Sequence, residues 1–471
     1  MLAVQVLEFV LFAVFSYVIY IVFLQRYKYF QLNVPRVKSK NGILNFIFGE
    51  SMVLGDLNNR HKVIKKWRNE AKSDVFAINV LFRPLVLVFD KDLIHLLSTD
   101  PSFHKTYELR VILKDIADGM LLQEEQEHAA IRKSFLPIFN LANVQEMFPE
   151  FVAKANELIN ILPSSHSEYP IMHDIQKCTL DIIAKVAFNY DMKSMTSESA
   201  VSTAFDSILT KSTFGVFFLL KLVFPVLNQL PISKNINKND LQTVQNCIDN
   251  VIQQRIKTHT SNKDLLTSIL QSVQKEGIDL IGLRKQILTF LSAGHETTAT
   301  ALSWALYALA LHPEYQKELR DTLTFSDDPT WDDVQNNKFL QDVCDEVMRL
   351  YSPAAAIIRR TTKAFTFKGM TFPKDTRFNV LLQEMHFDCE DPLVFNPKRE
   401  KSDAVYMPFW IGNRGCIGKQ LAIVEFKTIL ATLIKRMEFG ILDRNKNVSR
   451  TSRITQRPDA LFLKIEKIHN K

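Results

Sequence analysis

The most informative segment of this 471-residue chain is MPFWIGNRGCIG, residues 407–418, followed by an amphipathic pattern over Lys419–Arg436 that predicts a helix. It places one cysteine, Cys416, among glycines and two residues after Arg414. The dipole and free amides at a helix start favour a thiolate there, and glycines allow tight turns. No base lies beside the sulfur, so the pattern indicates a permanent metal ligand. A buried free cysteine in a glycine turn is the weaker interpretation.

This segment resembles the heme-binding signature of the cytochrome P-450 family, F-x-x-G-x-R-x-C-x-G, at Phe409, Gly412, Arg414, Cys416 and Gly418. Five such positions recur by chance in about one chain in ten thousand. Three further motifs follow the order and approximate spacing of the family, and the resemblance spans nearly the whole chain. They are A-G-x-E-T-T at 293–298, E-x-x-R at 346–349 and F-x-P-x-R at 395–399.

The resemblance implies that Cys416 is the axial thiolate ligand of a noncovalent heme b, in a loop where Phe409 and Gly418 also contribute to heme binding. Thiolate donation to iron favours cleavage of the O–O bond, and amide groups near Gly418 are expected to tune the sulfur. Trp410 replaces the small residue that is usual after the phenylalanine, so we expect different packing beneath the sulfur.

The resemblance also assigns residues to the heme propionates. Arg132, Arg359 and Arg414 align with arginines that pair with these carboxylates, a role suited to the planar guanidinium group. His128 stands four residues before Arg132, where eukaryotic members commonly carry tryptophan. A histidine can still donate a hydrogen bond to a propionate, so we include it in the site.

Two further groups of residues are implied by the resemblance. Glu296 and Thr297 resemble the acid–alcohol pair that guides protons to dioxygen, and they are out of place on an otherwise largely apolar helix. Glu346, Arg349 and Arg399 resemble a buried salt-bridge triad that locks the cysteine side of the molecule, and breaking such a triad is costly.

Composition favours one large domain. Beyond Pro35 we find no low-complexity tract, repeat or linker rich in Pro, Gly or Ser, and 46% of the residues are hydrophobic. The fold class expected is mainly α with small β-sheets, and the resemblance implies the cytochrome P-450 fold. The five cysteines are scattered, which argues against disulfides or a zinc site. A net charge of +7 is too small and dispersed to imply nucleic acid.

The N-terminus predicts a membrane anchor. Residues 9–24 are uncharged and mostly apolar, and basic residues follow directly. A cleaved signal peptide is the alternative, but a basic start and a cleavage pattern are missing. The positive-inside rule keeps the following domain in the cytoplasm. We therefore expect a single-pass anchor at 1–24, a basic juxtamembrane linker at 25–45 and a catalytic domain at 46–471, on the endoplasmic reticulum membrane.

Periodicity predicts the remaining elements. Residues 100–118 and 387–407 show no convincing hydrophobic periodicity and are expected to be loops. Gly294 lies within an expected helix, where glycine is unfavourable, so it needs a structural reason such as close approach of a flat ligand or a helix crossing. Helices are expected at 56–71, 91–98, 124–135, 148–162, 172–188, 283–311 and 342–350, and strands at 75–80, 85–89, 365–367, 370–372, 377–382 and 460–465.

The expected activity is that of a membrane-anchored heme-thiolate monooxygenase with an apolar small-molecule substrate. The resemblance implies electrons from NADPH through a flavoprotein reductase, with a small heme electron carrier as a further partner. The segments expected to line the substrate pocket are 103–118, 214–227, the helix around Phe290, 354–358 and 453–457. Residues 214–227 fit two interpretations equally well, a core helix and a flap that dips into the membrane. The alternatives are an isomerase or lyase acting on peroxides, a heme sensor and a heme-free scaffold.

The resemblance places basic side chains where an acidic reductase would dock on the cysteine side. For each of these residues, a position on a solvent-exposed helix face without any partner is an equally good explanation. These residues are Lys133, Lys419, Lys427, Lys435 and Arg436.

Overall fold

The computed structural model describes most of the chain, and the statements below concern the described residues. These are 27–37, 49–50, 54–80, 83–114, 116–196, 200–211, 238–258, 264–276, 280–400, 405–443, 448–452, 454–468 and eight single positions between 8 and 24. Within them, no helix has the length and apolar character that a bilayer crossing requires. Most of the expected anchor and all of segment 214–227 lie outside the described residues.

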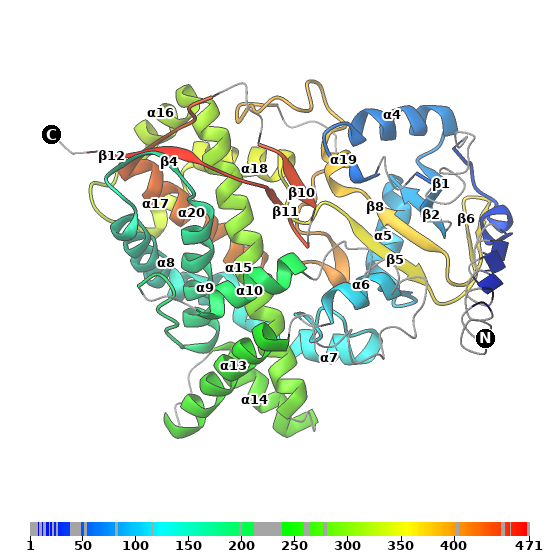
Figure 1. Ribbon diagram of the computed structural model, residues 1–471, viewed down its shortest axis with the longest axis horizontal. Helices are drawn as coiled ribbons and strands as arrows, with labels where there is room; N and C mark the ends of the chain where they lie inside the picture. Colours follow the sequence, from blue (N-terminus) through cyan, green and yellow to red (C-terminus); the bar gives the residue numbers. More distant parts are fainter. Residues whose placement is uncertain are drawn as a thin grey trace.

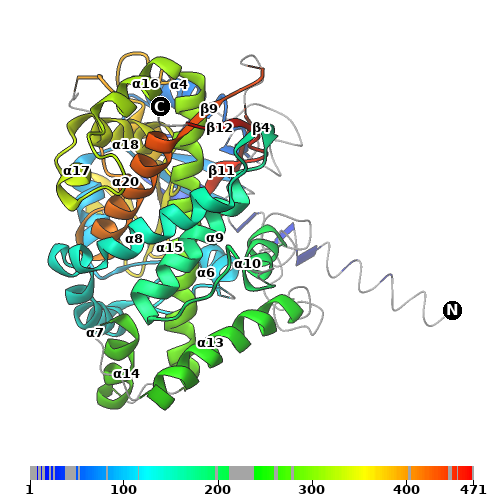
Figure 2. The ribbon, with the colours of Figure 1, turned by 90° about the vertical axis from the view of Figure 1, so that its left-hand side faces the viewer.

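Helices form one half of the molecule and are arranged around the long helix α15, Leu280–Leu311 (Figures 1 and 2). The middle and end of α15 are buried on nearly all sides, as expected for a helix that is apolar around its circumference. The helices that surround it or extend this half are α7 Glu125–Phe135, α8 Leu141–Ile161, α9 Met172–Phe188, α10 Ala200–Lys211, α13 Lys238–Thr258, α14 Leu265–Glu276, α16 Pro313–Thr322, α17 Trp331–Gln335, α18 Lys338–Leu350 and α20 Lys419–Arg436, with the 3-10 turn η1 Leu136–Phe139.

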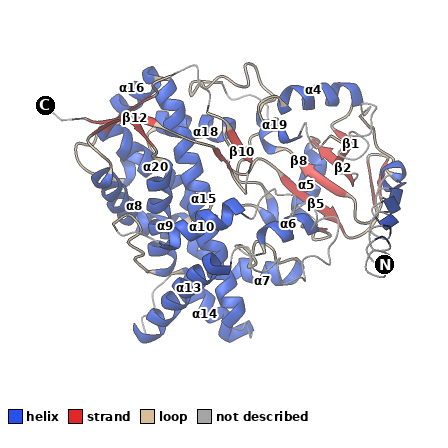
Figure 3. Cartoon of the chain, in the orientation of Figure 1, coloured by secondary structure: helices blue, strands red, loops and turns tan. Residues whose placement is uncertain are grey.

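A five-stranded sheet organises the other half (Figure 3). Its order is β1-β2-β8-β5-β3; β1 and β2 form a hairpin, and β2 pairs in parallel with β8. The elements of this half are β1 Val75–Val80, β2 Arg83–Val88, β3 Phe103–His104, β5 Ile357–Thr361, β6 Phe365–Phe367, β7 Met370–Phe372, β8 Arg377–Val380, α4 Arg60–Ala71, α5 Lys91–Thr99, α6 Tyr107–Leu113 and α19 Leu382–His386.

Two smaller sheets lie on the helical half. The C-terminal strand pairs on both sides in a three-stranded sheet of order β4-β12-β9, and a separate hairpin joins β10 to β11. Their bounds are β4 Ser165–Tyr169, β9 Met437–Gly440, β10 Arg450–Ser452, β11 Gln456–Pro458 and β12 Leu463–Lys467. Each half has its own hydrophobic core, which we call the helical core and the sheet core.

Most of the predicted elements are confirmed, and three local predictions are wrong. Segment 100–118 was expected to be a loop but contains β3 and α6. The Thr106 hydroxyl caps the start of α6 by accepting a hydrogen bond from the N–H of Leu109. Helix α8 begins at Leu141, where the Asn140 side chain caps it, and it continues through Pro149. The strand expected at 377–382 ends at Val380 and is followed by α19.

Helix α20 has the predicted bounds, but the prediction that it is amphipathic is wrong. Most of its residues are buried, including Glu425 and Lys427. It packs against α8 and α15 as well as α17. The charged residues that suggested a solvent face are therefore largely covered by neighbouring helices.

Candidate functional site: the cysteine loop and its surroundings

The cysteine loop joins the two cores. Met407 and Trp410 are buried in the sheet core, whereas Phe409 and Ile417 pack against the helical core. The backbone N–H of Cys416 donates to the carbonyl oxygen of Phe409 at 2.9 Å, which closes the loop just before α20. The sulfur is therefore fixed with respect to both halves of the molecule.

Two residues give the loop its turns. Gly412, in the 3-10 turn η3 Gly412–Arg414, has φ +68°, and a Cβ there would lie 2.6 Å from the carbonyl oxygen of Ser98 in α5. Trp410 has φ +58°, which is rare for a bulky side chain. Its buried indole Nε1 has no hydrogen-bond partner among the described residues. The backbone is thus strained at the position where the loop departs from the family signature.

The Cys416 sulfur lies in a dense but accessible environment. Burial raises the pKa of the Cys416 thiol, while the N–H of Gly418 and the cations of Arg132 and Lys419 lower it. The cysteine side chain is nevertheless accessible. A Cβ on Gly418 would meet no atom within 4 Å. This combination fits a ligand that approaches the sulfur from within the protein.

The central helix α15 also has an accessible strip. Ala293 is exposed and Thr297 is half-buried, one turn apart, although Ser292 and Thr298 beside them are buried. The Thr297 hydroxyl donates to the carbonyl oxygen of Ala293 at 2.7 Å. Accessible surface in the middle of a central helix also fits a ligand held inside the molecule.

Glu296 is buried in a polar network beside this strip, with 3% of its surface exposed. Its Oε2 accepts from Gln176 Nε2 at 3.1 Å, and its Oε1 accepts from the Thr455 hydroxyl at 2.8 Å. Arg457 Nη1 lies 3.6 Å from Oε1 and also 2.8 Å from Asp206 Oδ1 in α10. The carboxylate is therefore joined through Arg457 to a partly exposed acid.

Gly294 has a packing role. A Cβ at this position would lie 2.7 Å from Cγ1 of Ile183 in α9, so only glycine permits this close approach of α9 and α15. The helix crossing proposed from the sequence is therefore a sufficient reason for the glycine. Helix α15 is continuous through this position.

The four predicted propionate residues are brought together in a cluster, with His128 and Arg359 buried and Arg132 and Arg414 partly buried. Burial and the charges of Arg414, Lys105, Arg132 and Arg359 lower the pKa of His128 to about 3. Burial and then the charge of Arg414 lower the pKa of Arg359 to about 10. Lys105, which the sequence reading did not include, belongs to the same cluster. Burial is the largest cause of both shifts, and the neighbouring cations add to it.

The acid nearest this cluster is already shared. Glu124 forms ion pairs with Arg414 and, at 3.1 Å, with Arg110. Arg132 instead donates to the carbonyl oxygen of Gly415 at 2.8 Å, and the buried Nε of Arg359 has no partner among the described residues. A dianionic ligand beside the accessible sulfur would supply the missing charge, so these residues fit a heme with its two propionates.

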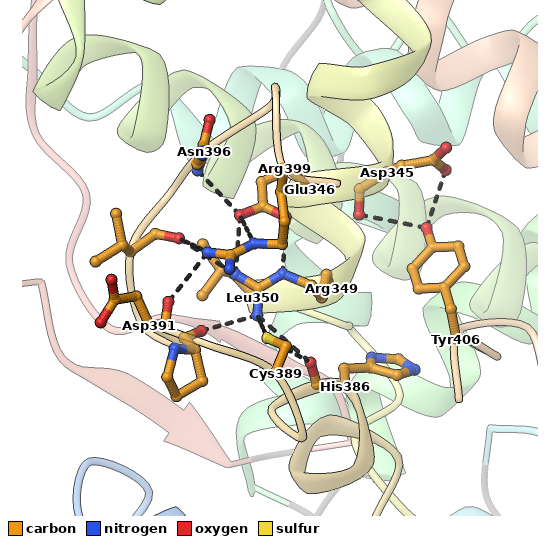
Figure 4. Close-up of polar contacts among 12 residues, drawn as sticks. Asp345, Glu346, Arg349, Leu350, His386, Cys389, Asp391, Asn396, Arg399 and Tyr406 are labelled. Carbon is orange, nitrogen blue, oxygen red and sulfur yellow. Dashed lines mark hydrogen bonds and ion pairs between the residues drawn. The ribbon is translucent and has the colours of Figure 1, made fainter. Parts of the chain in front are cut away.

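The predicted triad is assembled on α18 and the segment after α19 (Figure 4). Arg349 binds both oxygens of Glu346, with Nε at 2.7 Å from Oε2 and Nη2 at 2.8 Å from Oε1. Arg399 Nε lies farther away, 3.4 Å from Oε1, and its guanidinium also donates to the carbonyl oxygens of Asp391 and Val394. The triad thus fastens the irregular segment that leads to the cysteine loop.

Sequence reasoning missed His386, which supports the cysteine loop directly. The ring Nε2 of this buried residue accepts from the backbone N–H of Met407 at 3.2 Å. Its ring also lies 5.4 Å from that of Tyr406, between centroids. Burial and then the charge of Arg349 lower the pKa of His386 to about 4. No local motif marks this histidine, because its partner is distant in sequence.

His386 is expected to make folding sensitive to acid. Its folded pKa lies below the value of about 6.5 in an unfolded chain, so its contribution is present above pH 6.5 and is lost as the pH falls toward 4. The loss is at most about 3 kcal/mol. Denaturant unfolding of His386→Leu from pH 7 to 4.5 should therefore show a smaller decline than the unaltered protein. The exposed-site control His95→Leu should decline like the unaltered protein; equal slopes for all three would contradict this role.

Glu425 was also missed. It is 2% exposed in α20, its Oε2 lies 3.5 Å from the Thr298 hydroxyl, and its Oε1 has no partner among the described residues. Burial raises the pKa of Glu425 well above its usual range, which favours the neutral acid. The sequence feature that could have identified Glu425 is its position as an acidic residue within a largely apolar stretch of α20.

Comparisons with known proteins agree with this geometry. The family pattern of Cytochrome P450 matches residues 41–465. The chain is 28% identical over 473 residues to Cytochrome P450 monooxygenase FUM15 of Gibberella moniliformis, covering 79% of this chain and 78% of that protein. It is 26% identical over 427 residues to Cytochrome P450 4A24 of Sus scrofa, covering 82% of each. It is also 26% identical over 394 residues to Taurochenodeoxycholic 6 alpha-hydroxylase of Sus scrofa, covering 76% and 77%.

Proposed function

The chain belongs to the cytochrome P450 family and is a monooxygenase of that family, and we propose that it inserts one oxygen atom of dioxygen into an apolar small molecule. The electrons come from NADPH through a flavoprotein reductase. The observation that carries this proposal is the accessible Cys416 side chain close to a partly buried cluster of cations. A relative that is named as a hydroxylase supports the same type of reaction.

The cofactor in this proposal is heme b, with Cys416 as its thiolate ligand. His128, Arg132, Arg359 and Arg414 hold its propionates. The heme supplies redox chemistry with dioxygen, and the thiolate favours cleavage of the O–O bond. Phe409 and Gly418 shape the loop around the sulfur, since the Phe409 carbonyl accepts from the Cys416 N–H and the Gly418 N–H faces the sulfur.

Glu296 and Thr297 have the proton-handling role. Glu296 Oε1 receives a proton through its hydrogen-bonded network with Thr455, close to Arg457 and the partly exposed Asp206. The Thr297 hydroxyl lies on the accessible strip of α15, and because it donates its hydrogen to the carbonyl oxygen of Ala293, its oxygen can accept a hydrogen bond from the reacting molecule. The two side chains thus divide delivery and positioning between them.

Replacing Glu296 with glutamine should separate electron consumption from product formation. The amide preserves the shape and some hydrogen bonds but cannot carry the proton, so product formed per NADPH should fall about 100-fold. The carbon monoxide spectrum should stay unchanged. Asp321→Asn, which removes an exposed acid from α16, should leave the yield unchanged. An unaltered yield in Glu296→Gln would contradict the role.

The electron donor is a flavoprotein reductase with an acidic docking face, and a small heme carrier uses the same surface. Lys419 and Lys133 are exposed on the cysteine side and can contribute to it. The predicted inclusion of Lys427 is wrong, because it is buried and donates to the carbonyl oxygen of Gln335 at 3.2 Å. Lys435 and Arg436 also donate to carbonyl oxygens of the chain, those of Leu323 and Asp327.

The protein is held in the endoplasmic reticulum membrane by residues 1–24, with its catalytic domain in the cytoplasm. This part of the proposal is supported by the apolar N-terminal segment and the basic residues that follow it. An apolar substrate reaches such an enzyme through the lipid. Fractionation after carbonate extraction tests the anchor: the full chain should stay with the membrane pellet, and a chain lacking residues 1–24 should be released.

The substrate pocket is proposed between the cysteine loop and segments that include 354–358, where Ala354 is exposed and Ile357 is half-buried. The helix around Phe290 can contribute to this pocket through its accessible strip at Ala293 and Thr297, but the Phe290 side chain itself does not. Its ring is buried and stacks on Phe139 at 5.6 Å between centroids, so it belongs to the helical core. The apolar character of the proposed lining favours a lipid, sterol, terpenoid or xenobiotic.

Turnover with a panel of such compounds tests the proposed reaction against the alternatives. A monooxygenase requires NADPH, reductase and dioxygen, and its product carries one oxygen atom from labelled dioxygen. An isomerase or lyase acting on peroxides would turn over without reductase, and a sensor would bind ligands without turnover. The Glu296–Thr297 pair favours the monooxygenase, since the other reactions have no need of proton delivery.

A further inference from the structure

A second pocket, of about 370 Å³, lies beside the cation cluster of the cysteine site and shares Lys105 with it. Its volume is within the range of about 300–1,000 Å³ that is typical of small-molecule sites. We propose that this pocket binds a phosphate group. Its lining consists of five cationic side chains, one acid and one tyrosine: Lys28, Lys105, Arg110, Arg360, Arg377, Asp375 and Tyr107.

The acids around this pocket leave part of its positive charge without a partner. Arg360 Nη1 pairs with Asp375 at 2.7 Å. Arg377 pairs at 3.0 Å with Glu108, but Glu108 also pairs with Arg83. Arg110 pairs at 3.1 Å with Glu124, which is likewise shared with Arg414. Two of the three acids therefore each serve two arginines.

Two lysines also line the pocket, and one of them, Lys105, is shared with the cation cluster of the cysteine site. Lys105 is only 4% exposed, and neither its ammonium nor that of Lys28 has an ion-pair partner in the part of the chain that the structure describes. Burial and then the charge of Arg359 lower the pKa of Lys105 well below its usual range. Burial also lowers the pKa of Arg377. An anion in the pocket would stabilise the charged forms of both side chains.

The arrangement of these side chains suits a phosphate group. Arg360 on β5 and Arg377 on β8 lie directly opposite each other in the antiparallel pair of strands, and Arg110 comes from α6 (Figure 1 shows the three elements). A phosphate offers several acceptor oxygens, and guanidinium groups match their geometry. A carboxylate has fewer oxygens and less charge to satisfy so many donors.

Such a phosphate could belong to a lipid headgroup or to a soluble molecule. Lys28 lies four residues beyond the apolar segment 1–24, which brings the pocket close to the proposed anchor and favours the headgroup. The lipid source rests on the proposed membrane attachment. Phosphate binding itself rests only on the charges and contacts of the pocket, so it can hold where the anchor fails.

Calorimetry with the full-length heme-loaded protein tests the proposal. The probes are inorganic phosphate, soluble dihexanoyl phosphatidic acid, and dihexanoyl phosphatidylcholine as a lipid of no net charge. Phosphatidic acid should bind, and the double variant Arg110→Gln/Arg360→Gln should weaken it by about tenfold or more, because two charge-assisted hydrogen bonds are lost. Lys62→Gln/Lys66→Gln makes the same charge change on the exposed face of α4 and should bind like the unaltered protein.

The variant Asp375→Asn gives a test in the opposite direction. It removes the pocket's acid and frees Arg360, so phosphate should bind several-fold more tightly, which a misfolded protein would not show. Variant-sensitive binding of inorganic phosphate indicates a soluble source, and binding of phosphatidic acid alone indicates a headgroup. No binding of either, or equal binding by Arg110→Gln/Arg360→Gln, would overturn the proposal. An unchanged carbon monoxide spectrum separates these results from loss of the heme site.

Discussion

Replacing Glu346 with alanine is expected to lower the free energy of unfolding by about 3–5 kcal/mol, because it leaves a buried arginine without its acid. Glu346 and Arg349 side chains are 5% and 9% exposed, and both oxygens of the carboxylate are used. Glu346 Oε1 also accepts from the backbone N–H of Asn396 at 2.9 Å. Denaturant unfolding followed by circular dichroism measures the loss.

The matched control lies on the same helix. Asp342 pairs with Lys338 in α18, but the Lys338 side chain is 75% exposed, so Asp342→Ala should cost no more than about 0.5 kcal/mol. The difference between the two variants measures the effect of burial on otherwise similar ion pairs. A cost below about 1 kcal/mol for Glu346→Ala would contradict the role of the triad in fastening the segment before the cysteine loop.

Replacing Cys416 with alanine is expected to abolish monooxygenase turnover and the thiolate-type carbon monoxide spectrum. The reason is chemical, because no other described cysteine stands in this loop and a methyl group cannot bind iron. The fold should persist, since the side chain is accessible and alanine requires no extra space. Spectroscopy and unfolding measurements on the same preparation distinguish loss of the ligand from loss of the fold.

Cys389→Ala is the control for this variant. Its partly buried thiol lies 3.8 Å from Arg349 Nη1 and 3.7 Å from the carbonyl oxygen of His386, in the segment fastened by the triad. The spectrum of Cys389→Ala should match that of the unaltered protein. Retention of the thiolate spectrum by Cys416→Ala, or its loss in Cys389→Ala, would contradict the assignment of the sulfur.

The sequence predicted the elements of the site because its motifs are local. Five positions within one short loop identify the cysteine segment, and regular apolar spacing predicts the long helix that carries Glu296 and Thr297. Hydrophobic spacing reports which residues share a helix face and says nothing about what covers that face. For this reason the solvent face expected on α20 was wrong, and Lys427 is buried.

The partners of the site residues could not be predicted in the same way. Glu296 contacts Gln176, Thr455 and Arg457 only because α9 and the β10–β11 hairpin pack against α15. The support of Met407 by His386 likewise depends on how α19 folds back. Such contacts join residues that are distant in sequence, so no local pattern records them.

The carbon monoxide difference spectrum of the reduced, full-length protein tests the central claim most directly. A heme bound through the Cys416 thiolate should give the strongly shifted Soret band that a thiolate ligand produces. The band should appear in proportion to the heme content. A spectrum without that shift, in protein that is folded and contains heme, would contradict the assignment of Cys416 as the iron ligand.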